Sequence, residues 1–184
     1  MKEVRIHARA GQGAITTGAL LGLAAFAKGR YALAFPTFGA ARMGAAMNAF
    51  VRLGDEVIRL RSQVYEPDYL IIMDPTLMRG FDVFAGCHDG GIAIVNQKEP
   101  VQPPAHAKGV KVYSVPGNDI AQEVMGRPLG NTALLGAFAA ATGEIDLPSL
   151  EKAIRGRFKG KPAEQNVEAA KRGYEYMKKL LGQN

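Results

Sequence analysis

The chain has 184 residues, of which 47% are hydrophobic and 22% charged, an ordinary composition for one globular domain with a sizeable core. Its formal net charge of +6 suits a phosphorylated ligand, an acidic protein partner or nucleic acid. Cys87 is the only cysteine, which excludes an intrachain disulfide and any cysteine-based iron–sulfur or zinc site.

The amino-terminal residues Met1–Arg9 are charged and strand-like, unlike a secretory signal. The apolar stretch Ala14–Ala27 is shorter than the roughly 20 residues that span a bilayer. We therefore expect a cytoplasmic protein without a membrane-spanning segment.

In chain order, the first predicted elements are a strand, a glycine turn and a helix. Residues 2–8 alternate between polar and apolar side chains, as in a half-buried strand. Gly11-Gln12-Gly13 follows, and the apolar run from Gly13 to Lys28 predicts a helix that Gly29 ends.

The next segment has no clean period. Pro36, Gly39 and Gly44 interrupt residues 31–45, which predicts a long ordered loop. Residues 47–53 and 56–62 alternate on either side of Gly54-Asp55, which predicts a β-hairpin.

The remainder of the chain alternates apolar strands with helices and ends in helices. Asn131 is expected to cap the helix that follows it. The predicted strands are 69–73, 91–96 and 110–115, and the predicted helices are 76–84, 118–126, 132–143, 147–158 and 161–181.

This order predicts an α/β fold with a mixed, mainly parallel sheet flanked by helices. We expect a single domain over residues 1–184. Its α/β core covers about 1–145, and a C-terminal helical segment covers about 146–184.

The glycine turn is the main candidate site. Glycines at a strand-to-helix turn leave backbone N–H groups and the positive end of the helix dipole free for an anion. The dinucleotide fingerprint requires a glycine at position 16, where this chain has Thr16, and a nucleotide P-loop requires Gly-Lys where it has Gly18-Ala19. From the residues alone, an anion-binding turn and a tight turn without a ligand remain equally open.

Other candidates are weaker. Arg42, in the predicted loop, could pair with a phosphate or carboxylate, or be a solvated residue of a core-covering loop. The polar group at 63–68 is best explained as a turn set by Pro67, although a catalytic pair is conceivable there. The three scattered histidines have no metal-ligand spacing, so we expect no catalytic and no metal-binding residues.

Four ordered segments resemble one known family, the gamma subunits or domains of the 2-oxoacid:ferredoxin oxidoreductases, which include pyruvate:ferredoxin oxidoreductase. The family's opening, a strand followed by Gly-Arg-Gly-Gly-Gln-Gly and a helix, is similar to residues 8–13. Its loop Phe-Pro-x-Phe-Gly-x-Glu-Arg-Arg-Gly-Ala-Pro is similar to residues 35–46. Residues 58–77 and 130–143 resemble two further family segments.

The resemblance implies a subunit that is inactive alone, in a complex that converts a 2-oxo acid and CoA to acyl-CoA and CO2. Thiamine diphosphate and iron–sulfur clusters are then expected in partner subunits: thiamine-binding alpha and beta subunits and a cluster-bearing delta-type subunit. Electrons would pass to ferredoxin or another carrier. On this chain the resemblance implies CoA binding, for which the candidate residues are Gly11, Gln12, Gly13, Arg42 and Asn131.

The chain departs from the family pattern in two places. Ala8 and Ala10 replace glycines before the turn, and Ala41 and Met43 replace a glutamate and an arginine of the loop. A more apolar loop suits a bulkier or aromatic 2-oxo acid, such as an arylglyoxylate. The alternative function is a stand-alone dinucleotide-binding module; a nucleic-acid-binding protein is disfavoured because no recognisable motif is present.

Overall fold

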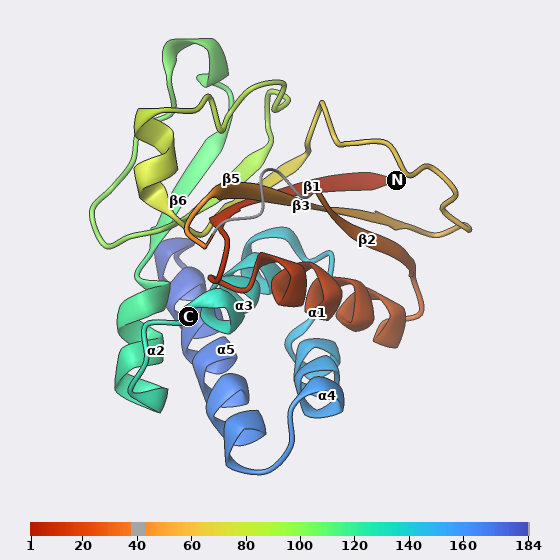
Figure 1. Cartoon of the computed structure of the whole chain (residues 1–184), viewed down its shortest axis with the longest axis vertical. Coiled ribbons are helices and arrows are strands. Elements are labelled where there is room, and N and C mark those ends of the chain that lie inside the picture. Colours follow the sequence, from red (N-terminus) through yellow and green to blue (C-terminus); the bar gives the residue numbers. More distant parts are fainter. Residues whose placement is uncertain (38–42, 184) are drawn as a thin grey trace.

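The computed structural model describes residues 1–37 and 43–183, and a six-stranded sheet in the order β2-β3-β1-β4-β5-β6 forms its centre (Figure 1). The strands are β1 (Lys2–Arg9), β2 (Tyr31–Thr37), β3 (Ala46–Gly54), β4 (Tyr69–Ile72), β5 (Ile92–Asn96) and β6 (Lys111–Val115).

Five of these strands run in one direction. β1, β4, β5 and β6 pair in parallel, whereas β3 is antiparallel to both of its neighbours, β1 and β2. The sheet is therefore mixed and mainly parallel, and the predicted α/β class is confirmed.

The predicted hairpin around Gly54-Asp55 is wrong. The hairpin is formed by β2 and β3, with Phe35 opposite Phe50, so residues 31–37 are a strand and not part of a loop. β2 lies at the edge of the sheet, where Pro36 is tolerated because an outward-facing donor is not needed.

Residues 56–62 form no strand because Arg52 holds them as a loop. Its buried guanidinium donates to the carbonyl oxygens of Leu60 at 3.0 Å and Ser62 at 2.7 Å. The same guanidinium is paired with Glu3. These bonds take up backbone acceptors that a strand ladder would have used.

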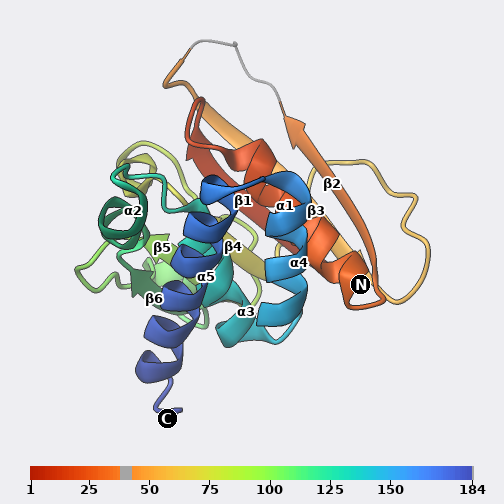
Figure 2. The same cartoon turned by 90° about the horizontal axis from the view of Figure 1, so that it is seen from below.

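Helices lie on one side of the sheet (Figures 1 and 2). Helices α1 and α3 pack against the strands, α4 packs on α1, and α5 packs on α3. The helices are α1 (Ala14–Ala27), α2 (Gly117–Met125), α3 (Asn131–Thr142), α4 (Leu147–Arg157) and α5 (Lys161–Leu180). In the described part of the chain, no helix is both long and apolar enough to cross a membrane.

Helices α3 and α5 approach each other at two glycines. A methyl group built on Gly136 would lie 1.9 Å from the carbonyl oxygen of Ala170, and one on Gly173 would lie 1.9 Å from that of Ala133. Only glycine fits at such a distance, so these residues set the spacing of the two helices.

The opposite face of the sheet is covered by irregular segments over β4, β5 and β6. The 3₁₀ helices η1 (Pro75–Arg79) and η2 (Ala105–Ala107) contribute Leu77 and Ala107 to a second apolar cluster there. No described helix covers the β1–β3–β2 part of this face (Figure 1).

Candidate functional site

The glycine turn joins β1 to α1 at the carboxyl end of β1. Gly11 and Gly13 have φ values of 100° and 86°, in the left-handed region that favours glycine. Gly13 is the N-cap of α1, and within residues 1–37 and 43–183 no side chain caps this helix. The first N–H groups of α1 therefore face no side-chain cap among the described residues, and the sequence left open whether such a turn binds an anion or no ligand.

Gln12 fixes the turn in place. Its amide oxygen accepts a hydrogen bond from the Arg9 backbone N–H at 2.7 Å, and its amide nitrogen donates to Asp74 Oδ2 at 2.8 Å. Both ends of the side chain are therefore engaged within the protein. Gln12 thus holds the turn against β1 and Asp74, and the ligand contact that the resemblance implies for it stays a prediction.

Asp74, directly after β4, places a carboxylate beside the turn. Burial alone would raise its pKa, but hydrogen bonds from Thr76 and Gln12 and the charge of Arg9 hold the pKa below its usual value. Arg9 Nε lies 3.2 Å from Asp74 Oδ2. The negative charge is thus compensated before any ligand binds.

Asn131 lies next to the turn, but its predicted capping role is wrong. It is the first residue of α3, and Gly130 is the N-cap. The helix starts one residue early because the Gly130 carbonyl oxygen already accepts a helical hydrogen bond from the Leu134 N–H at 2.9 Å, while the Gly130 N–H is held by Asn118 Oδ1. A methyl group on Gly13 would lie 3.4 Å from Asn131 Nδ2, so the starts of α1 and α3 are adjacent.

Two asparagines that the sequence analysis missed hold this end of the sheet together. Asn96 Nδ2 donates to the Met73 carbonyl oxygen at 2.9 Å, and Asn96 Oδ1 accepts from the Asn118 N–H at 3.1 Å. Asn118 Oδ1 accepts in turn from the Gly130 N–H. The sequence did carry one signal for this role, because Asn96 is a polar residue at the end of an otherwise apolar strand. The network places the starts of α2 and α3 at the carboxyl ends of β4 and β5.

The second predicted segment also meets the turn. The Ala10 N–H donates to the Ala45 carbonyl oxygen at 2.8 Å, and the Gly44 N–H donates to that of Ala10 at 3.1 Å. Met43, which is 85% exposed, covers Gly11, where a methyl group would lie 2.6 Å from its sulfur. Arg42 lies outside the described residues.

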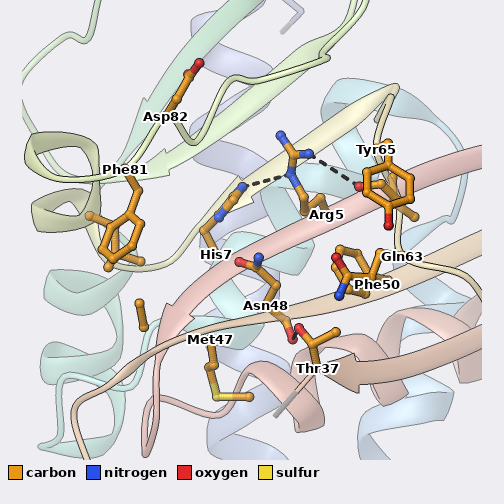
Figure 3. A pocket seen from close by; sticks show the side chains of 13 residues that line it. Arg5, His7, Thr37, Met47, Asn48, Phe50, Gln63, Tyr65, Phe81 and Asp82 are labelled. Carbon is orange, nitrogen blue, oxygen red and sulfur yellow. Dashed lines mark hydrogen bonds between the residues drawn. The ribbon is translucent and has the colours of Figure 1, made fainter. Parts of the chain in front are cut away.

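The polar segment 63–68 does not join this site. Asp68 accepts hydrogen bonds from the Glu3 N–H and from Lys2 Nζ, each at 2.8 Å, which agrees with a turn. Gln63 and Tyr65 line a separate pocket on the opposite face of the sheet, together with Arg5 and His7 (Figure 3). Among residues 1–37 and 43–183, no three His, Cys, Asp or Glu side chains group as a metal site.

Comparisons with known proteins agree with this architecture. The family model described as "Pyruvate ferredoxin/flavodoxin oxidoreductase" matches residues 3–176. The pyruvate synthase subunit PorC of Methanothermobacter thermautotrophicus is 44% identical over 180 residues, which cover 98% of each chain. The common subunit gamma of the pyruvate/ketoisovalerate oxidoreductases of Pyrococcus furiosus is 46% identical over 178 residues, covering 95% of this chain and 96% of that one.

A solved structure is similar throughout. The crystal structure of the pyruvate oxidoreductase subunit PORC from Thermotoga maritima superposes with a TM-score of 0.84 at 36% identity, covering 95% of each chain. The sheet order, the glycine turn and these matches lead to one conclusion: the chain belongs to the pyruvate ferredoxin/flavodoxin oxidoreductase family, as a gamma subunit of an oxidoreductase complex.

Proposed function

We propose that this subunit contributes the CoA-binding surface of a complex that oxidises a 2-oxo acid to acyl-CoA and CO2. One observation carries the proposal: the uncapped start of α1, formed by two left-handed glycines, lies beside the start of α3. Backbone N–H groups at adjacent helix starts suit a phosphate, and CoA is a phosphorylated co-substrate.

The side chains around the turn fit an anion. Asp74 would repel a phosphate if it were uncompensated, but Arg9, Thr76 and Gln12 already satisfy it. Gln12 would act by holding the glycines in register with β1. Bound CoA would supply the thiol that receives the acyl group, while this chain binds and orients its phosphate-bearing part.

The remaining cofactors belong to partner subunits in this proposal. With one cysteine, the chain offers no cysteine set for a cluster. We assign thiamine diphosphate to alpha and beta subunits and iron–sulfur clusters to a delta-type subunit, with ferredoxin or another carrier as the acceptor. The substrate class is pyruvate or a bulkier 2-oxo acid, and the apolar Met43 above the turn favours the bulkier class.

Gly13→Ala in the assembled complex tests the CoA assignment. The added methyl group strains a backbone with φ of 86° and approaches Asn131 Nδ2. Gly29→Ala is the matched control, since Gly29 has φ of 84° but nothing lies within 4 Å of an added methyl group. Calorimetry should show CoA affinity reduced at least tenfold by the first change and not by the second. Equal CoA affinity in the two folded complexes would contradict the assignment.

Substrate preference needs its own assay. Turnover of pyruvate, a branched 2-oxo acid and phenylglyoxylate by the complex should favour the bulkier substrates, and Met43→Arg should shift the preference towards pyruvate. A complex that strongly prefers pyruvate before the change would rule out the bulkier class. Among the described residues nothing favours the dinucleotide alternative, because β2, Tyr31–Thr37, carries no acidic residue to bind a ribose.

A further inference from the structure

A pocket of about 480 Å³ lies on the face of the sheet opposite the helices (Figure 3). Arg5 and His7 on β1 and Asn48 on β3 contribute to its lining. Tyr65 and Phe81 stand on either side of the Arg5–His7 pair in this view, and they are 70% and 57% exposed. Polar groups are therefore buried behind an exposed aromatic rim.

Two buried arginines on this face have different electrostatic environments. Arg52, 1% exposed, bonds to loop carbonyls and is paired with the Glu3 carboxylate at 2.6 Å. Arg5, 7% exposed, also bonds to loop carbonyls, those of Val83 at 3.2 Å and Ala85 at 2.5 Å. In residues 1–37 and 43–183, no carboxylate lies within 4.0 Å of the Arg5 guanidinium.

The titratable neighbours of Arg5 do not neutralise it. His7 accepts the Arg5 Nε–H through Nε2 at 3.0 Å, and burial and the charge of Arg5 lower its pKa to about 3, so it is neutral. Burial raises the pKa of Cys87 to about 11, so its thiol is neutral as well. Asp82 also lines the pocket and its negative charge acts on Arg5, but it forms no ion pair with Arg5, and its Oδ1 is engaged by the Phe84 N–H and by His106. A buried positive charge thus borders the pocket without a close counter-charge, which is costly.

We propose that this pocket receives an aspartate or glutamate side chain from a partner subunit of the complex. This proposal depends on the function proposed above in one respect: both require this chain to assemble with partner subunits. The recorded hydrogen bonds use four of the five N–H groups of Arg5, through Nε, Nη1 and twice Nη2, within the described residues. The fifth, together with the amides of Asn48 and Gln63, can bind a carboxylate.

The rim indicates a protein partner and not a free acid. Exposed aromatic side chains that surround a buried polar pocket resemble a binding hot spot, in which an apolar ring excludes water from a charged pair. Among the described residues, no α-helix covers the face around the pocket, and the 3₁₀ helix η1 only borders it through Leu77. The partner segment is therefore expected to carry one acidic residue within an apolar surface.

Asn48→Asp is the decisive variant, because it places a nearly isosteric carboxylate in the pocket, opposite His7 on β1, where its negative charge would repel an incoming carboxylate. Gln183→Glu, at the exposed carboxyl-terminal end, changes the net charge equally and is the control. With the partner subunits, Asn48→Asp and Tyr65→Ala should each weaken assembly at least tenfold, measured by surface plasmon resonance. Gln183→Glu should assemble as the parent chain does.

Assembly of Asn48→Asp at the parent affinity would overturn the proposal. Two further results would also overturn it. One is that acetate binds to the parent chain but does not weaken its assembly with the partner subunits. The other is that Asn48→Asp changes only the self-association of this chain, seen by analytical ultracentrifugation. Circular dichroism of each variant verifies the fold. CoA binding is measured separately at saturating partner concentration, and Asn48→Asp should leave it unchanged. A failure of the CoA proposal would therefore not change the outcome of the assembly experiment.

Discussion

Replacing Gly173 by alanine should destabilise the protein by pushing α3 and α5 apart. The new methyl group would lie 1.9 Å from the carbonyl oxygen of Ala133 and 2.6 Å from its carbonyl carbon. Both neighbours are backbone atoms of a helix, so no side chain can rotate away. Restoring an ordinary contact of about 3.3 Å requires a separation of about 1.4 Å.

The cost follows from the packing that this separation disrupts. A gap of about 1 Å removes up to about half of the dispersion energy of each affected contact, and overpacked cores lose about 1–3 kcal/mol or more. Because the obstacle is backbone, we take about 4 kcal/mol and subtract about 1 kcal/mol for the better helix propensity of alanine. The net loss of about 3 kcal/mol corresponds to a fall in Tm of about 6–12 °C for a chain of this size.

Gly156→Ala is the matched control, because Gly156 also lies inside a helix, α4, but nothing lies within 4 Å of an added methyl group. This change should raise the free energy of unfolding by about 0.5–1 kcal/mol. Urea titration and thermal melts followed by circular dichroism measure both variants. A Gly173→Ala melt within about 2 °C of the parent would refute the reasoning.

Three further predictions concern single side chains. In the folded protein His7 has a pKa of about 3, whereas in the unfolded chain its pKa is about 6.5. The unfolded state therefore binds the proton first, and the free energy of unfolding should decrease as the pH is lowered from about 6.5 to about 3. The slope is at most about 1.4 kcal/mol per pH unit, and it should be missing from a His7→Gln variant in urea titrations. Gln12→Glu should cost about 1–3 kcal/mol at pH 7, because it replaces a donor to Asp74 with a second carboxylate, and the cost should shrink near pH 4. Burial raises the pKa of Cys87 to about 11, so little of its reactive thiolate is present at pH 8. Its alkylation by iodoacetamide at pH 8, followed by mass spectrometry, should be on the order of 100-fold slower than that of free cysteine. Equal rates would contradict its burial.

Elements with a strong local pattern were predictable from the sequence. The helix expected over 13–28 is observed at Ala14–Ala27, and the apolar strand predicted at 91–96 is β5, at Ile92–Asn96. Apolar runs with glycine at their ends determine such elements with little help from the rest of the chain. The turn at Gly11 and Gly13 was predictable for the same reason, because the left-handed conformation of a glycine depends mainly on the residue itself.

Elements that depend on distant partners were not predictable. Residues 56–62 alternate like a strand, but they are a loop because their carbonyl groups bind Arg52. Asn131 satisfies the local rule for a cap, but Gly130, whose N–H is held by the distant Asn118 side chain, begins the helix instead. Arg5 and His7 are two residues apart and therefore share one face of β1, but their common burial depends on loops far along the chain.

The packing of α1 has a consequence for synthesis of the chain. Residues 10–27 carry no charge, and buried residues of α1 such as Leu20 and Leu21 are enclosed by β1, β2, β3 and also α4, which ends at Arg157. A ribosome making about 5–20 residues per second needs many seconds to reach that helix. Throughout that interval the nascent chain exposes an uncharged apolar segment, so we expect its yield to depend on chaperones that hold such segments until α4 has been made.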